Sequence, residues 1–307
     1  MAARPRTLPA AIAPVLVGSA AADYQMHQCP HAAAPPHGYV IAFCQAPSFR
    51  WVAFVAALVG SVFIQIGTNL ANDYSDARRG ADATDRLGPV RVTSSGLVAP
   101  RRVLIATWLA FAVAVGAGIY LATVAGWVII AVGVASILAG VLYTGGPRPY
   151  GYAGLGEVFV FLFFGLVAVN GAYYVQLEEL DWLPFGLSLA VGCLATSILV
   201  VNNTRDIDTD RRAGKRTLAV RLGRDGARGL YVGLLAAAGV ALLLTSALND
   251  GPWWPLLGLA AAPLAVRPAR AVLTRTDGPS LNGALAGTGA LLGAFSLLVG
   301  AALVIAA

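Results

Sequence analysis

Carboxylate and amide side chains gather in two polar stretches of an otherwise apolar sequence. The first stretch covers residues 65–91 and reads QIGTNLANDYSDARRGADATDRLGPVR. If the apolar helix that carries Gln65 continues to Asp76, its polar side chains recur at i, i+3, i+4 and i+7 and share one helix face. The residues concerned are Asn69, Asn72, Asp73 and Asp76.

The second stretch covers residues 202–221 and reads NNTRDIDTDRRAGKRTLAVR. It repeats the arrangement, because Asn202, Asp206 and Asp210 stand at i, i+4 and i+8 and fall on one face of a helix. Asp208 points away from that face, so we expect it to lie outside the site that the other acids form.

The chemistry of these side chains points to a phosphate-bound metal. Carboxylates and amides are hard oxygen ligands, which suit magnesium bridging to a phosphate better than they suit zinc or copper. An aspartate near the centre of a bilayer costs roughly 3 kcal/mol, so a cluster of them requires positive partners. Arg86, Arg91, Lys215 and Arg216 stand beside the acids in the sequence and would contact a diphosphate directly. Together these groups would neutralise a departing diphosphate and make carbon–oxygen ionisation feasible.

The elements that carry the two stretches are membrane helices. The chain of 307 residues is 58% hydrophobic and only 12% charged, and its mean hydropathy is +0.72, whereas soluble domains carry about 25% charged residues. We therefore predict an all-α, polytopic transmembrane bundle that forms one domain over residues 1–307. The formal charge of +6 does not indicate a nucleic-acid partner, because the basic residues cluster in the connections between apolar runs.

Nine apolar runs of a length suited to a hydrocarbon core of about 30 Å predict nine spanning helices. They cover residues 8–24, 51–72, 103–122, 125–143, 156–176, 182–202, 229–247, 253–272 and 284–305. A cytoplasmic N-terminus leaves Arg50 as the single basic residue on the outer side, and the positive-inside rule favours that orientation. Both acidic stretches then lie at the inner ends of spans, where they can converge. We expect a multi-pass protein of the cell membrane whose active site faces the cytoplasm.

The first outer connection, residues 24–50, leaves several readings open. His27, Cys29, His31 and His37 stand close together and would suit a metal if the loop were folded, while Cys29 and Cys44 would suit a disulfide outside the cytoplasm. The proline content favours a plain exposed loop. The small residues GSAAAD near position 20 also allow a signal peptide, which polytopic proteins rarely need.

The whole chain resembles the UbiA superfamily of intramembrane prenyltransferases. The segment NDYSDARRGADATDRLGPVR is similar to the first motif of the 1,4-dihydroxy-2-naphthoate polyprenyltransferases of menaquinone biosynthesis. The opening RPRTLPAAIAPVLVG and the segment DTDRRAGKRTLAVRLG are similar to the same subfamily. The chain departs from the pattern in its longer connection over residues 24–50 and in the extra carboxylate of Asp208.

The resemblance implies a role for each matching residue. The N-D-x-x-D motif corresponds to Asn72, Asp73 and Asp76, and the D-x-x-x-D motif to Asp206 and Asp210, with Asn202 one turn earlier. These residues are expected to bind Mg²⁺, and the four aspartates are the expected catalytic groups. Asp82 and Arg91 are expected in a loop that caps the site, and Lys215 and Arg216 on the diphosphate. Weaker candidates for the acceptor or the carbocation are Arg6, Asn69 and Tyr143.

The expected reaction is magnesium-assisted ionisation of a polyprenyl diphosphate and attack by a ring carbon of 1,4-dihydroxy-2-naphthoate on the allylic cation. Loss of a proton and of carbon dioxide then gives demethylmenaquinone. The sequence names no general base, and Glu157 is read either as a helix-start residue or as a partner behind the site. We expect membrane lipid to surround the helix bundle.

Two alternatives to this function stay open. Relatives in the superfamily use homogentisate, 4-hydroxybenzoate, haem or phosphoribosyl diphosphate as acceptors. A polytopic transporter would also carry intramembrane acids, but near the midplane and with broken helices, whereas these acids cluster at predicted helix ends. A CDP-alcohol transferase is excluded, because its D-G-x-x-A-R pattern is absent.

Overall fold

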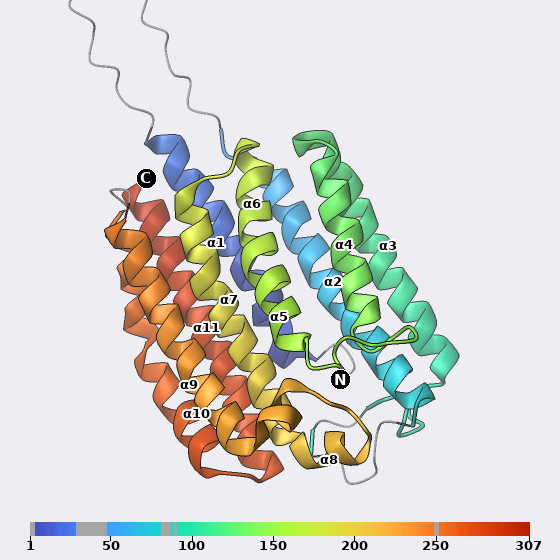
Figure 1. Cartoon of the computed structure of the whole chain (residues 1–307). Coiled ribbons are helices and arrows are strands. Elements are labelled where there is room, and N and C mark those ends of the chain that lie inside the picture. The colour runs from blue at the N-terminus through green and yellow to red at the C-terminus, as the bar shows by residue number, and fades with distance from the viewer. Residues whose placement is uncertain (1–3, 29–47, 81–86, 89–90, 249–251) are drawn as a thin grey trace, which may run out of the picture.

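The computed structural model describes residues 4–28, 48–80, 87–88, 91–248 and 252–307. The described residues form helices and connections without a strand, and the long helices run side by side as a bundle (Figure 1). The predicted all-α class is confirmed. Asp82, Arg86 and the predicted metal or disulfide residues Cys29, His31, His37 and Cys44 lie outside the described residues.

The helices follow one another in the order η1 (Pro5–Thr7), α1 (Leu8–His27), α2 (Trp51–Arg78), α3 (Pro100–Ala125), α4 (Val128–Leu142), α5 (Gly156–Val160), the π-helical η2 (Phe161–Val167), α6 (Ala168–Leu177), α7 (Trp182–Arg205), α8 (Ile207–Arg212), α9 (Leu218–Ala247), η3 (Trp254–Ala261), α10 (Pro263–Thr274) and α11 (Gly278–Ala306). In a hydrocarbon environment a single segment satisfies its own backbone hydrogen bonds only as a helix, which explains why the described elements are all helical.

Six of the described helices are long and apolar enough to cross a membrane. A seventh crossing arises if η3 and α10, which meet at a bend of 44°, are one span. The helix α4 is apolar but shorter. Every apolar run that we predicted coincides with a helix or a bent pair, so the chain is a multi-pass membrane protein. The count of nine crossings and the cytoplasmic position of the N-terminus stay predictions.

Polar residues mark where several helices begin. The carboxylate of Asp181 accepts a hydrogen bond from the backbone N–H of Leu183 (2.8 Å) at the start of α7. Asp277 accepts from the N–H of Ser280 (2.8 Å) at the start of α11. Such caps satisfy N–H groups that have no partner inside the helix.

Close backbone contacts hold the bundle together. A Cβ atom at Gly18 of α1 would lie 2.1 Å from the carbonyl oxygen of Val169 in α6, and one at Gly165 of η2 would lie 2.7 Å from Cα of Gly192 in α7. Small residues permit this approach in membrane helices, where packing replaces the hydrophobic effect as the driving force.

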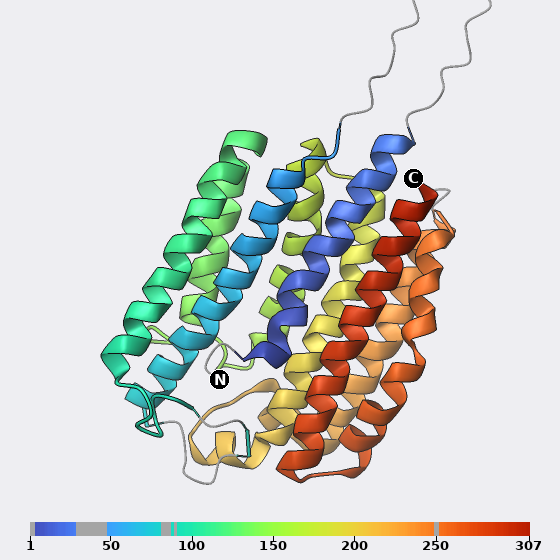
Figure 2. The ribbon, with the colours of Figure 1, turned by 180° about the vertical axis from the view of Figure 1, so that it is seen from behind.

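The helix α7 forms the centre of the bundle. Its apolar window is 83% buried, whereas those of the other five spanning helices are 22% to 44% buried. It packs against α1, α9 and α11, which surround it in both views (Figures 1 and 2). The helices α2, α3 and α4 stand together on the other side of α5 and α6 (Figure 2). The second acidic stretch therefore ends the most enclosed helix, and the first ends a helix of the opposite wall.

Candidate active site

A cavity of about 440 Å³ lies between the α2, α3 and α4 wall and the helices α5, α6 and α7. Its volume is typical of sites for small organic ligands. One end is polar, and the remainder is lined by aliphatic and aromatic side chains. The residues at the polar end are Arg4, Thr7, Asn69, Asn72, Asp76, Arg91, Tyr143, Thr144, Tyr150, Tyr152, Asn202, Asn203, Asp206, Asp210 and Lys215.

The first acidic stretch lies on a continuous helix, as predicted. Because α2 runs to Arg78, the four polar residues of its face are all buried, with exposed fractions of 1% to 5%. Asn69, Asn72 and Asp76 line the cavity. The carboxylate of Asp73 turns instead to the following connection, where it accepts hydrogen bonds from the backbone N–H groups of Val92 (3.2 Å) and Thr93 (3.1 Å).

The second acidic stretch departs from the predicted single helix. The helix α7 ends at Arg205, Asp206 has φ −95° and ψ 7°, and α8 begins at Ile207. The segment is rich in Asn, Asp and Thr, which are weak helix formers because their side chains compete for backbone hydrogen bonds. The hydroxyl of Thr209 donates to the carbonyl oxygen of Asp206 (2.9 Å) at the break.

The acids nevertheless keep their helical i, i+4 spacing across the break. The N–H of Asp206 donates to the carbonyl oxygen of Asn202 (3.2 Å), and the N–H of Asp210 donates to that of Asp206 (2.8 Å). All three residues line the cavity. Asp208 does not; it is exposed and forms a salt bridge with Arg224 (3.0 Å), as its helical phase predicted.

Lys215 brings the two acidic stretches together. Its Nζ atom lies 3.6 Å from Oδ1 of Asp76 and 3.8 Å from Oδ1 of Asp210. The ammonium group also lies over the ring of Tyr152, 4.7 Å from its centre. Residues more than 130 positions apart in the sequence thus meet around one buried cation.

Further cations balance the buried carboxylates. The guanidinium group of Arg91 lies 2.8 Å from Oδ2 of Asp76, whose other oxygen accepts a hydrogen bond from the hydroxyl of Tyr152 (2.5 Å). Arg205 donates to both carboxylate oxygens of Asp206, from Nε to Oδ1 at 2.8 Å and from Nη2 to Oδ2 at 2.6 Å. Adjacent residues do not face each other in a regular helix, so this last pair depends on the break at Asp206.

Besides Asp73, two predicted residues do not line the cavity. The side chain of Arg216 is exposed. Its backbone N–H donates to the carbonyl oxygen of Tyr152 (2.8 Å), which lines the cavity. Arg6 is also exposed, and Arg4 lines the cavity in its place. The reason is local: Arg4 has φ 46° and starts the short helix η1, which sets the direction of the side chains ahead of α1.

Sequence reasoning missed most of the connection between α4 and α5. Tyr150 and Tyr152 come from its PRPYGYAG segment, and Thr144 donates from its start to the amide oxygen of Asn72 (2.8 Å). Burial raises the pKa of Tyr150 above its ordinary value, so its phenol stays protonated and donates to the carbonyl oxygen of Ala139 (2.8 Å). The sequence signal that could have indicated these cavity residues was the pair of tyrosines in a glycine-rich connection.

Glu157 takes both of the roles left open for it. It stands in the first turn of α5, and its Oε1 atom accepts a hydrogen bond from the amide of Asn203 (2.8 Å), which lines the cavity. Its side chain is buried, and Oε2 has no hydrogen-bond partner among the described residues. Glu157 therefore supports the cavity wall from behind.

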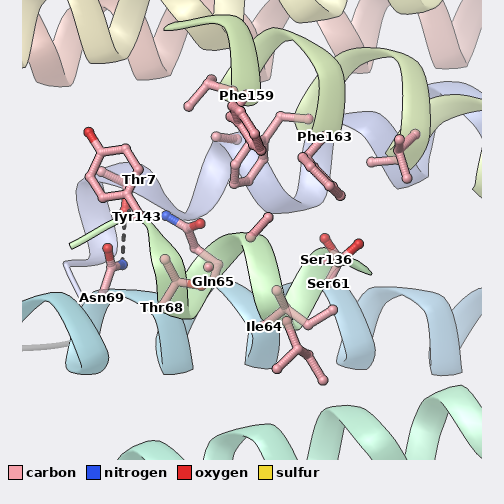
Figure 3. Close-up of a pocket in the computed structure, with 18 of the residues that line it drawn as sticks. Thr7, Ser61, Ile64, Gln65, Thr68, Asn69, Ser136, Tyr143, Phe159 and Phe163 are labelled. Atoms are coloured by element: carbon pink, nitrogen blue, oxygen red, sulfur yellow. Dashed lines mark hydrogen bonds between the residues drawn. The ribbon is translucent and has the colours of Figure 1, made fainter. Parts of the chain in front are cut away.

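The polar end continues into an apolar channel. Figure 3 shows Phe159 and Phe163 pointing into the cavity opposite the α2 wall that carries Gln65 and Asn69. The hydroxyl of Thr7 accepts hydrogen bonds from the amides of Gln65 (3.1 Å) and Asn69 (3.3 Å) and so connects η1 to α2 (Figure 3). An apolar chain attached to a charged group would match this cavity.

The donor set at the polar end fits magnesium by its chemistry, because it consists of carboxylate and amide oxygens. Within the described ranges, no three Asp, Glu, His or Cys side chains gather closely enough to hold an ion by themselves. Magnesium is commonly bound by one or two carboxylates together with phosphate oxygens of a substrate. The carboxylates of Asp76, Asp206 and Asp210 could bind it in that way.

The chain is similar to known proteins along most of its length. The model of the UbiA prenyltransferase family matches residues 33–286. The 1,4-dihydroxy-2-naphthoate octaprenyltransferase of Mycobacterium tuberculosis is 46% identical over 301 residues, which cover 98% of this chain and 94% of that protein. The Escherichia coli protein of the same name is 37% identical over 299 residues, covering 94% and 90%.

A solved structure, that of a UbiA homolog from Archaeoglobus fulgidus bound to DMAPP and Mg²⁺, has the same fold. Its TM-score is 0.60 at 14% sequence identity, and the match covers 98% of each chain.

Proposed function

Because the chain belongs to the UbiA prenyltransferase family, we propose that it transfers a polyprenyl group from polyprenyl diphosphate to 1,4-dihydroxy-2-naphthoate. Carbon dioxide is lost, and the product is demethylmenaquinone. The observation that carries the proposal is the meeting of two acidic helix ends around Lys215 at the polar end of an apolar cavity. The two relatives compared above, which carry the name of this activity, support the choice of acceptor.

The diphosphate binds at the polar end of the cavity. Arg91 and Lys215 already lie beside Asp76 and would contact the diphosphate oxygens. Magnesium, when bound, neutralises the charge that develops on the leaving diphosphate. The residues proposed to hold it are Asn72, Asp76, Asn202, Asp206 and Asp210; Asp73, also predicted as a ligand, does not line the cavity. Asp73 contributes chiefly by fixing the backbone of Val92 and Thr93.

The prenyl tail extends from the diphosphate into the apolar channel past Phe159 and Phe163. Aromatic faces near the polar end attract the allylic cation. Tyr150 stacks on Phe159 with ring centres 4.0 Å apart, and Tyr143 meets Tyr150 edge to face at 5.4 Å. These three rings are the proposed cation-stabilising wall.

The aromatic acceptor binds between this wall and the polar residues of η1 and α2. Thr7, Gln65 and Asn69 present hydroxyl and amide groups to the cavity, as the hydroxyls of a naphthoate require. The acceptor ring is already electron-rich, so the chain chiefly has to position it and to exclude water. The basic residues around the acidic ends favour a site at the cytoplasmic face of the cell membrane, in contact with membrane lipid.

The transporter alternative gains no support from the arrangement of the acids. Asp76 lies near the end of α2, and Asp206 lies at the end of α7. A transport site would require such groups near the middle of the helices.

The decisive experiment incubates purified protein with Mg²⁺, 1,4-dihydroxy-2-naphthoate and a series of polyprenyl diphosphates, and measures the lipid product by mass spectrometry. The expected product carries the prenyl group and lacks the carboxyl group, and chelation of Mg²⁺ abolishes it. A product that retains the carboxyl group would contradict the naphthoate assignment, as would turnover that appears only with 4-hydroxybenzoate or homogentisate.

A further inference from the structure

Two connections of the chain meet beside the polar end of the cavity, the one between α4 and α5 and the one between α8 and α9. The backbone N–H of Arg216 donates to the carbonyl oxygen of Tyr152 (2.8 Å), which joins them. Both lie at the end of the bundle that carries α8 (Figure 1). Each supplies a group beside Asp76: the hydroxyl of Tyr152 lies 2.5 Å and the ammonium group of Lys215 lies 3.6 Å from its Oδ1 atom.

The side chain of Arg221 joins the same two connections a second time. Its Nη2 atom donates to the carbonyl oxygen of Ala153 (2.8 Å), and its Nε atom donates to the carbonyl oxygen of Arg216 (3.2 Å). Ala153 directly follows Tyr152 in the chain, and Arg216 directly follows Lys215. Because the donors of a guanidinium group are fixed in one plane, a single arginine can hold two carbonyl groups at a set separation.

The local backbone explains why Arg221 faces these connections. The hydroxyl of Thr217 accepts a hydrogen bond from the N–H of Val220 (3.4 Å) and so caps the start of α9. The N–H of Arg221 donates to the carbonyl oxygen of Thr217 (3.1 Å). Gly223, with φ 71° and ψ 178°, then interrupts the helix. Arg221 therefore stands on a first turn that is set apart from the rest of α9.

Gly154 allows the connection between α4 and α5 to approach Arg221. A Cβ atom at this position would lie 2.8 Å from the carbonyl oxygen of Arg216 and 3.1 Å from Nε of Arg221. The backbone of Gly154 also has φ 77°, which glycine adopts more readily than other residues. A side chain here would push the two connections apart.

We propose that Arg221 is a positioning residue for the diphosphate site, a role that rests on the proposed function above. Tyr152 and Lys215 line the cavity, whereas Arg221 does not. Arg221 acts through these two residues, because it fixes the backbone next to each of them. It thereby keeps the Tyr152 hydroxyl and the Lys215 ammonium group beside Asp76, where the diphosphate binds.

This proposal predicts a selective loss of affinity for the diphosphate substrate. Arg221→Ala is expected to raise the KM for the prenyl diphosphate about fivefold to tenfold, the effect of about one lost hydrogen bond. The KM for the acceptor is expected to stay unchanged. A purely structural role would lower the amount of active protein and leave both KM values as they are. Steady-state kinetics with each substrate varied in turn would distinguish the two.

Binding of inorganic pyrophosphate with Mg²⁺ tests the same role without turnover. The rise in melting temperature on titration gives an apparent Kd, which Arg221→Ala is expected to weaken by the same factor. Gly154→Ala keeps the charge of Arg221 and displaces the contact, so it is expected to weaken pyrophosphate binding as well. Arg221→Lys keeps the charge but reaches at most one carbonyl, so an intermediate Kd is expected.

A double-mutant cycle tests whether Arg221 acts through Lys215. In the Lys215→Met background, Arg221→Ala is expected to lower kcat/KM for the prenyl diphosphate by only about twofold, because coupled residues are not additive. A loss as large as in the wild-type background would contradict that route.

Arg228→Ala is the matched control for the arginine. Arg228 stands on the same helix and also donates to two backbone carbonyls, those of Val272 (3.0 Å) and Arg275 (3.4 Å), but none of the three residues lines the cavity. Gly126→Ala is the control for the glycine, because Gly126 has φ 81° and a Cβ there would meet nothing within 4 Å. Both controls are expected to bind pyrophosphate as the wild-type protein does.

The proposal is overturned if folded Arg221→Ala and Gly154→Ala bind pyrophosphate as tightly as their controls. It is also overturned if only Arg221→Ala binds weakly, since the charge of the side chain rather than its contacts would then matter. Absence of prenylated naphthoate from the wild-type protein would instead contradict the proposed function, and the pyrophosphate titration would still decide the role of Arg221. A wild-type protein that binds no pyrophosphate would contradict both.

Discussion

The acidic ends of α2 and of α7 look alike in sequence but are held in different ways. Asp73 and Asp76 stand on an unbroken helix, and all of their described partners come from elsewhere: the 91–93 segment, Tyr152 and Lys215. Asp206 stands at a helix break, and its closest described partner is the adjacent Arg205.

The difference shows two solutions to one problem, the burial of negative charge in a membrane protein. Among the described residues, no cation of α2 pairs with Asp73 or Asp76, so the first stretch depends on Arg91, beyond the end of α2, and on Lys215 of the second stretch. The second stretch pairs Asp206 with the adjacent Arg205, and its helix must break to allow that pair. Lys215 of the second stretch joins the two, since it lies beside an acid from each.

The largest expected effect comes from removing a carboxylate of the first stretch. Asp76→Asn takes away a proposed magnesium ligand and leaves Arg91 and Lys215 buried beside a neutral group. We expect a loss of kcat of at least about 10³-fold, on the scale of lost transition-state charge stabilisation. The measurement is product formation at saturating Mg²⁺ by a protein shown to be monodisperse. Activity within tenfold of wild type would show that the first stretch does not hold the diphosphate.

A smaller loss is expected when the shared cation is removed. Lys215→Met keeps the length of the side chain and removes its charge, so the two stretches no longer meet on one ammonium group. We expect kcat/KM for the prenyl diphosphate to fall about 10²-fold, and Lys215→Arg to retain part of the activity. Steady-state kinetics with the diphosphate varied would measure both. Wild-type kinetics for Lys215→Met would mean that the two stretches act independently.

The smallest effect is expected at the acid that the second stretch turns outward. Asp208→Asn breaks an exposed salt bridge with Arg224, and such pairs contribute at most about 1 kcal/mol. Activity should stay within about twofold of wild type, whereas Asp206→Asn should abolish it. An inactive Asp208→Asn together with an active Asp206→Asn would show that the acids of the second stretch have been assigned to the wrong faces.

Helical spacing was a good guide to the first stretch and an incomplete one to the second. The face of Asn69, Asn72, Asp73 and Asp76 follows from a period of 3.6 residues, which a continuous membrane helix must obey. The break at Asp206 could not be predicted in this way, because the i+4 hydrogen bonds persist across it. Helical spacing also could not predict which of Arg4 and Arg6 lines the cavity, because the directions of their side chains depend on the left-handed backbone of Arg4 ahead of α1.

The sequence by itself determined that this chain is an all-helical membrane protein, which residues are acidic and at what helical spacing, and that cations had to accompany them. Hydrophobicity and periodicity are local properties, so they can be read from neighbouring residues. Only the tertiary structure decided which cations do so. It assigned Arg91 and Lys215 to Asp76, Arg205 to Asp206, and Asn282 of α11 to hydrogen bonds with Arg205 and Leu87. Asp76 and Lys215 are 139 residues apart and Leu87 and Asn282 are 195 apart, so only the packing of distant helices brings them together, whereas Arg205 reaches the adjacent Asp206 because the helix breaks there.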